Sequence, residues 1–205
     1  MLVCFALEAE AEAFRSIVAN RRAVVILITG IGRINAEKAL RATLKTFPPQ
    51  RVLTCGFAGG LNPALARGEV IYETENDALR ARLQAVGATP AKFFCAARIA
   101  TTVAEKRELR RTTGADAVEM ESAAIQEICR AHALPCATVR VISDPDDEDL
   151  PLDFNQLAKA DLNLHYGKLV WAIAQSPTKI PALLRLRKHC QGAANRLAET
   201  LTKLI

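Results

Sequence analysis

The sequence predicts an α/β fold in which a largely parallel sheet is covered by helices on both faces. Short apolar runs alternate with stretches of helical periodicity, half of the 205 residues are hydrophobic, and the run 23–29 (AVVILIT) is rich in β-branched residues. Strands that alternate with helices form parallel sheets, and an uninterrupted apolar run is typical of a strand buried on both faces.

The expected elements follow one another along most of the chain. We expect strands at 2–6, 23–29, 51–56, 69–72, 93–99, 115–118 and 136–142, and helices at 9–18, 34–44, 77–86, 103–111, 122–132, 162–175 and 180–204. The Gly- and Pro-bearing stretch 58–63 is expected to form a loop. The length predicts one domain over residues 1–205, with C-terminal helices of about 154–205 packed on it.

The composition argues against a nucleic-acid-binding or membrane-spanning protein. The net charge of +5 comes mainly from basic residues near the C-terminus that stand among leucines, and aromatic residues make up only 5%. This pattern is typical of a solvated helix face. No stretch is apolar enough to cross a bilayer, and Glu8, Glu10 and Glu12 interrupt any signal peptide. We expect a cytoplasmic protein whose six cysteines are reduced.

Acidic residues stand at the ends of three predicted strands. Glu8 and Glu10 follow the first strand, Glu119-Met120-Glu121 follows a later one, and Ser143-Asp144 follows the strand 136–142. Sites form at the carboxyl ends of parallel strands, and desolvating a carboxylate without a partner is expensive. The pattern therefore predicts a functional cluster. For Glu8 alone, the simpler interpretation is an acid at a helix N-terminus.

Such a cluster fits the cleavage of a glycosidic bond, because that reaction builds positive charge on the sugar and negative charge on the departing base. A buried Asp with a raised pKa can protonate the base. An ionised Glu can bind the ribose hydroxyls, and another carboxylate can orient the attacking water.

Two other motifs carry weaker signals. The acidic run 144–149 lacks the glycine and the spacing of a calcium loop, so we expect no metal. Gly30-Ile31-Gly32 matches half of a dinucleotide fingerprint, but Asn35 replaces the third glycine and the expected acidic residue is absent. We therefore expect no cofactor. The alternatives are an oxidoreductase built on these glycines and a non-catalytic nucleoside- or lipid-binding module.

Five short motifs occur in order over residues 1–145. They are Ala6-Leu7-Glu8-Ala9-Glu10, Thr29-Gly30-Ile31-Gly32-Arg33-Ile34-Asn35-Ala36, Gly56-Phe57-Ala58-Gly59-Gly60-Leu61, Val118-Glu119-Met120-Glu121-Ser122 and Arg140-Val141-Ile142-Ser143-Asp144. Together they resemble the nucleoside phosphorylase and methylthioadenosine/S-adenosylhomocysteine nucleosidase superfamily. The resemblance implies a phosphorylase/hydrolase-like three-layer αβα fold with a mixed, largely parallel sheet. It also implies an enzyme that cleaves the N-glycosidic bond of a purine nucleoside containing adenine.

The resemblance further implies roles for residues within these motifs. By this resemblance Asp144 is the acid that protonates the purine at N7, and Ser143 helps to position it. Met120 and Glu121 bind the ribose, Glu121 through the 2′ and 3′ hydroxyls. Glu119 belongs with them among the substrate-binding residues.

The nucleophile side of the site is also implied by the resemblance. Glu10 and Arg140 resemble the pair that positions the attacking water in the nucleosidase branch, Ile31 lines the 5′ side of the sugar, and Ala58-Gly59 lies along base and sugar. The opening Ala-Leu-Glu-Ala-Glu differs from the Gly-Asp-Pro-x-Arg phosphate motif of hexameric phosphorylases. This favours hydrolysis, with phosphate as the alternative co-substrate. Family members usually pair, so we expect a homodimer or larger homo-oligomer.

Residues 57–63 and 179–186 are more particularly similar to the hopanoid-associated phosphorylase group, which is linked to removing adenine from adenosylhopane. A basic amphipathic C-terminal helix suits peripheral contact with a lipid substrate at a membrane, although core packing explains the same leucines. Where the nucleosidases place a base-stacking Phe, this sequence has Ala97, with Phe93 and Phe94 nearby.

Overall fold

The computed structural model describes residues 1–21, 23–157 and 177–205. Its strands are β1 (Leu2–Phe5), β2 (Val25–Ile28), β3 (Val52–Gly60), β4 (Val70–Glu73), β5 (Thr89–Pro90), β6 (Phe93–Cys95), β7 (Ala117–Glu119) and β8 (Cys136–Asp144). Its helices are α1 (Glu8–Val18), α2 (Arg33–Leu44), α3 (Asp77–Ala85), α4 (Val103–Thr113), α5 (Ser122–Ala131), α6 (Phe154–Leu157), the 3-10 helix η1 (Pro177–Lys179) and α8 (Ile180–Thr202). The expected helix 162–175 lies outside the described residues.

The central sheet is mixed and largely parallel, as predicted. Its strands follow the order β2-β1-β3-β8-β4-β5, and β7 pairs with both β3 and β6. The pairs β1–β2, β1–β3 and β3–β8 are parallel, whereas β4 runs antiparallel to β8 and β7 antiparallel to β3. The carboxyl ends of β1, β2, β3 and β8 therefore lie along one edge of the sheet, here called the carboxyl edge.

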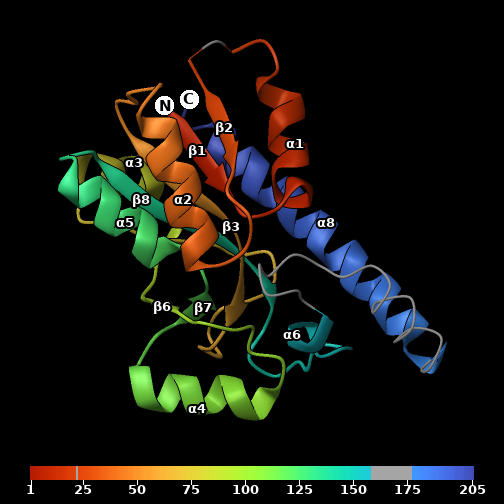
Figure 1. The fold of residues 1–205 in the computed structure, drawn as a ribbon. Helices are drawn as coiled ribbons and strands as arrows, with labels where there is room; N and C mark the ends of the chain where they lie inside the picture. Colours follow the sequence, from red (N-terminus) through yellow and green to blue (C-terminus); the bar gives the residue numbers. More distant parts are fainter. Residues whose placement is uncertain (22, 158–176) are drawn as a thin grey trace.

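Helices cover both faces of this sheet and complete the three layers. In β1, Val3 and Phe5 join a hydrophobic core with residues of α1 and α8, while Leu2 and Cys4 pack with residues of α2 and α5. This division follows from the two-residue period of a strand. Figure 1 shows α2 and α5 on one side of the sheet and α1 and α8 on the other.

The strand predicted over residues 23–29 forms as β2, but it is less buried than predicted. β2 is an edge strand that pairs with β1, and each of its four residues is only partly buried. Its side chains still pack against the cores on both faces of the sheet. The apolar run therefore indicates that helices cover both faces of the strand. It does not indicate whether a second strand pairs with it on the side away from β1.

Two strands extend further than the sequence predicted. β3 continues through Ala58-Gly59-Gly60, which we expected in a loop, and β8 continues through Ser143 and Asp144. Pairing between the two strands satisfies backbone groups that a loop would leave open, and this outweighs the turn preference of glycine. The register shifts between Ala58 and Gly59, so that Gly59 pairs with Asp144 and Ser143 is the extra residue of a β-bulge.

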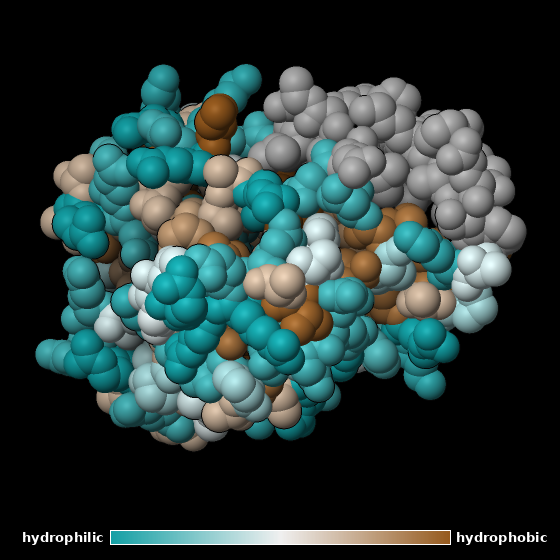
Figure 2. Space-filling view, turned by 90° about the horizontal axis from the view of Figure 1, so that it is seen from below, coloured by the Kyte–Doolittle hydropathy of each residue, from teal (hydrophilic) through white to brown (hydrophobic). Residues whose placement is uncertain are grey.

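The surface seen in Figure 2 is mostly hydrophilic, with hydrophobic residues visible in separate groups. Within residues 1–21, 23–157 and 177–205, no helix combines the length and the hydrophobicity needed to span a bilayer. The six cysteines form no disulfide in the structure.

Candidate active site

Buried polar side chains gather at the edge where the parallel strands end. Glu10 lies in the first turn of α1, just after β1, and Arg140 lies in β8. Glu119 ends β7, which pairs antiparallel with the last residues of β3 and so runs back toward this edge, and Glu121 follows it. All four side chains are almost completely buried.

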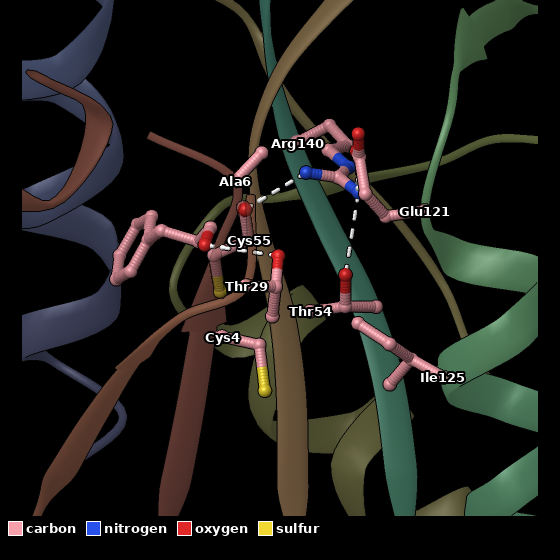
Figure 3. A pocket seen from close by; sticks show the side chains of 9 residues that line it. Cys4, Ala6, Thr29, Thr54, Cys55, Glu121, Ile125 and Arg140 are labelled. Atoms are coloured by element: carbon pink, nitrogen blue, oxygen red, sulfur yellow. Dashed lines mark hydrogen bonds and ion pairs between the residues drawn. The ribbon is translucent and has the colours of Figure 1, made fainter. Parts of the chain in front are cut away.

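Arg140 is the centre of this cluster. Its Nη2 lies 2.6 Å from Glu119 Oε2 and 3.2 Å from Glu121 Oε2, and its Nη1 donates to the carbonyl oxygen of Cys55 at 2.8 Å. Figure 3 shows the guanidinium beside Glu121 at a pocket that Thr54 and Cys55 also line. Arg140 Nε is buried and has no hydrogen-bond partner in the described part of the chain. One donor therefore stays free for an oxygen of a ligand or a water.

The two glutamates beside Arg140 differ in how readily they take up a proton. Burial acts to raise the pKa of Glu119, but Arg140 and hydrogen bonds from the Ser122 hydroxyl and backbone outweigh it, so that this pKa is lowered. Burial raises the pKa of Glu121 to about 7, against the attraction of Arg140 and with repulsion from Glu119. Glu121 Oε1 also accepts a hydrogen bond from the Gly32 N–H at 2.8 Å. Glu119 thus stays ionised, whereas Glu121 exchanges a proton near neutral pH.

Glu10 is fixed by backbone donors at both oxygens. Oε1 accepts from the N–H of Phe57 at 2.8 Å and Oε2 from the N–H of Leu7 at 2.9 Å. Burial raises the pKa of Glu10, while Arg140 and these hydrogen bonds oppose the shift. At Gly56, whose φ is 147°, a Cβ would come within 2.5 Å of Glu10 Oε1 and 2.6 Å of Arg140 Nη1. Only glycine leaves room for the two side chains to approach the same point.

Asp144 lies further along β8 and is also buried. Its Oδ1 is 2.5 Å from Ser143 Oγ, and its Oδ2 is 2.7 Å from Lys106 Nζ. Burial raises the pKa of Asp144, although Lys106 and Ser143 oppose the shift. Across the strand pair, a Cβ on Gly59 would lie 3.3 Å from Asp144 Oδ2, so the glycine keeps space beside the carboxyl group. A buried carboxyl with a raised pKa can act as a general acid.

A comparison with known families places the chain in one of them. The profile of the phosphorylase superfamily matches residues 8–97 and 77–173, which is most of the chain. The chain belongs to the phosphorylase superfamily.

Two relatives of the chain are nucleosidases by name. The chain is 30% identical over 171 residues to a 5'-methylthioadenosine/S-adenosylhomocysteine nucleosidase of Actinobacillus succinogenes, a match that covers 67% of this chain and 74% of the relative. It is 25% identical over 175 residues to an aminodeoxyfutalosine nucleosidase of Campylobacter jejuni, covering 65% and 72%. The structure of a 5'-methylthioadenosine/S-adenosylhomocysteine nucleosidase from Neisseria meningitidis, in complex with methylthio-immucillin-A, matches with a TM-score of 0.73 and 20% identity over 99% and 96% of the chains.

These similarities confirm the predicted superfamily, the three-layer fold and the class of enzyme, a nucleosidase. The hopanoid-associated subgroup and the oligomeric state stay predictions.

The remaining residues that the superfamily motifs pointed to lie around the same sheet edge. Ile31 is in the turn between β2 and α2, next to the glycine that contacts Glu121. The carbonyl oxygen of Ala58 accepts from Ser143 Oγ at 3.3 Å, and Met120 is buried. Glu8 does not join the cluster, because its side chain is 72% exposed and pairs with Arg15.

The two motifs with weaker signals make contacts within the protein. The N–H of Gly32, at the N-terminus of α2, is taken by Glu121, where a dinucleotide would place a phosphate. In the acidic run, Asp144 pairs with Lys106, Glu148 pairs with Arg67, and Asp149 accepts from a backbone N–H of α4. Across the described ranges, no three His, Cys, Asp or Glu side chains are grouped as a metal site.

Two residues that shape the site, Gly56 and Lys106, were not predicted from the sequence. Gly56 stands in a motif that we singled out, but its role depends on two side chains from distant parts of the chain. Lys106 lies in a helix rich in charged residues, where nothing in the sequence distinguishes it from its exposed neighbours. Phe93 and Phe94, the candidates for an aromatic contact to the base, each pack against a hydrophobic cluster.

Proposed function

We propose that this chain hydrolyses the N-glycosidic bond of a nucleoside that contains adenine. The observation that carries the proposal is the placement of Asp144, a buried carboxyl group with a raised pKa, at the same sheet edge as the buried cluster of Glu10, Glu121 and Arg140. The nucleosidase names of the sequence relatives support the same chemistry.

The charge of the cluster favours water over phosphate as the nucleophile. Three buried carboxylates, those of Glu10, Glu119 and Glu121, surround one guanidinium, and Arg140 already uses its terminal nitrogens on protein acceptors. A phosphate dianion would meet excess negative charge in a medium where charges interact strongly. A water can instead donate to Glu10, whose two oxygens each retain acceptor capacity, and can accept from the free Nε of Arg140.

The reaction then follows from these positions. Asp144 transfers its proton to N7 of the departing adenine as the bond between C1′ and the base breaks, and the sugar becomes an oxocarbenium ion. Glu121 accepts hydrogen bonds from the ribose hydroxyls. Glu10 takes a proton from the water whose oxygen bonds to C1′. The two proton transfers add water across the broken bond and release adenine and a free sugar. Exchange with solvent then removes the proton from Glu10 and returns one to Asp144.

A substrate panel tests this proposal. Purified protein is incubated with 5'-methylthioadenosine, S-adenosylhomocysteine, adenosine and a lipid-linked adenosine, each with and without phosphate, and adenine and the sugar product are separated by chromatography. We expect adenine and a reducing sugar without added phosphate, and the rates across the panel rank the 5′ substituents. A strict requirement for phosphate, with sugar 1-phosphate as product, would overturn hydrolysis, and no adenine from any substrate would overturn the proposal.

Replacing Glu10 with glutamine tests the base that activates water. The amide keeps the size of the side chain but cannot accept a proton, so kcat should fall by about 10²- to 10⁴-fold. The matched control is Glu8→Gln, two residues away on the same helix, where the carboxylate is exposed and pairs with the exposed Arg15. Steady-state kinetics should show an ordinary rate for Glu8→Gln. Equal losses in the two variants would contradict the role of Glu10.

The pKa of Glu121 predicts a pH dependence of substrate capture. Because this pKa is raised to about 7, the side chain is largely protonated below pH 7 and accepts ribose hydroxyls poorly. We expect kcat/KM to rise with pH through about 7 and this rise to vanish in Glu121→Gln. A nucleoside that lacks the 2′ hydroxyl should show a weaker rise. An unchanged rise in Glu121→Gln would assign the titration to another group.

A further inference from the structure

Lys106 is completely buried, which is rare for a lysine. It lies on α4, the helix below β6 and β7 in Figure 1. Its Nζ donates to the carbonyl oxygens of Pro145 at 2.6 Å and Glu148 at 2.8 Å, and it lies 2.7 Å from Asp144 Oδ2. An ammonium group has three N–H donors, and all three are used. Lys106 therefore has no donor left for a substrate and acts on the reaction only through Asp144.

The contacts of Lys106 also fix the segment that follows the acid. Its three acceptors belong to residues 144, 145 and 148, so one ammonium group ties the carboxylate to the turn after β8. On the other side of this segment, Arg67 donates to the carbonyl oxygen of Ser143 at 3.0 Å and pairs with Glu148. Asp144 thus occupies a position that is defined from two directions.

The charge of Lys106 decides how strongly Asp144 retains its proton. Burial favours the neutral carboxyl, whereas the ammonium at 2.7 Å favours the ionised form. A general acid is most effective when its pKa lies near the working pH, because an acid that binds its proton too tightly donates it poorly. Among the described residues, the groups that interact with Asp144 from the elements packed around it are Lys106 of α4, Arg67 of the turn before β4, Ser143 of β8 and the Cys190 thiol of α8.

We propose that Lys106 is a positioning residue that sets the orientation and the charge of Asp144, so that the buried acid releases its proton to the departing base and regains it in each turnover. This inference rests on the proposed function. It adds a residue from outside the five motifs. This residue lies on α4, a helix that contributes no group to the buried cluster around Arg140.

The test is the pH profile of kcat/KM in Lys106→Met, which keeps the length and volume of the side chain without its charge. Activity should fall at high pH as Asp144 loses its proton. Removing the ammonium should move this alkaline limb upward by about one to three pH units. Lower activity or stability with the limb unmoved would show a structural role only and would overturn the proposal.

Two further variants sharpen this test. Arg107→Met removes an exposed cation from the next position of α4 and should leave the profile unchanged. Lys106→Gln keeps N–H donors for the carbonyl oxygens of Pro145 and Glu148 while it removes the charge. If Lys106→Met does not fold, the same upward shift is expected in Lys106→Gln, and its absence there overturns the proposal. A wild-type protein that releases no adenine from any nucleoside would refute the proposed function itself, whereas an active wild type with unshifted variants refutes only the role of Lys106.

Discussion

Replacing Asp144 with asparagine is expected to lower kcat for nucleoside cleavage by about 10²- to 10⁴-fold and to leave the fold intact. The amide has nearly the same shape, and its oxygen can still accept from Lys106 or Ser143. It has no proton to transfer to the base, so the glycosidic bond must break with an anionic leaving group. Steady-state kinetics, together with circular dichroism and substrate binding by calorimetry, check this result.

The matched control for this variant is Asp147→Asn, because Asp147 belongs to the same acidic run but is exposed. Its rate should equal that of the wild type. An undiminished rate in Asp144→Asn would remove the mechanism proposed for this site, whatever substrate the panel identifies.

Replacing Arg140 with methionine is expected to lower the free energy of unfolding by about 3 to 5 kcal/mol. The guanidinium is the cation that pairs with the buried carboxylates of Glu119 and Glu121, and its loss leaves two negative charges buried close together. One or both must then take up a proton, or water must enter the cluster. Chemical denaturation at neutral pH measures the loss, which should shrink at acid pH as the carboxylates become neutral.

An exposed ion pair provides the control for this stability prediction. Arg41 pairs with Glu37 one turn away on α2, and both side chains are about half exposed. Arg41→Met should cost no more than about 0.5 kcal/mol, because water screens such pairs. A triple variant, Arg140→Met with Glu119→Gln and Glu121→Gln, should recover part of the lost stability. If Arg140→Met were as mild as Arg41→Met, the cluster would not be the buried ion pair that the structure shows.

The sequence predicted the alternation of strands and helices because burial imposes a different hydrophobic period on each. In β1, both faces meet helices, so the apolar run is continuous and easily recognised. Glu10 and Asp144 were also identifiable, because residues at strand ends converge whatever the details of the loops. Arg140, which lies inside its strand, was indicated only by the resemblance to the superfamily. The position of β2 as the outermost strand was not predictable, because its apolar composition is that of a central strand.

The parts of the site that could not be predicted depend on contacts between distant residues. Gly56 is required by the side chains of Glu10 and Arg140, which lie in other strands and helices. The bulge at Ser143 arises from the pairing of β8 with β3. The residues of neither strand predict it by their own conformational preferences. Lys106 becomes special only because α4 places it against Asp144. Such features follow from the register and the packing of elements, which a single sequence does not encode locally.

The packing of α1 against α8 has a consequence for the order in which the site matures on the ribosome. α1 carries Glu10 and is among the first elements to be synthesised, yet Phe14 and Val18 share a core with Ala193, Leu197 and Leu201 of α8. A nascent chain that has not reached this part of α8 lacks the helix that covers the apolar side of α1. The carboxylate proposed to activate water therefore lies on a helix whose packing is complete only after α8 has been synthesised.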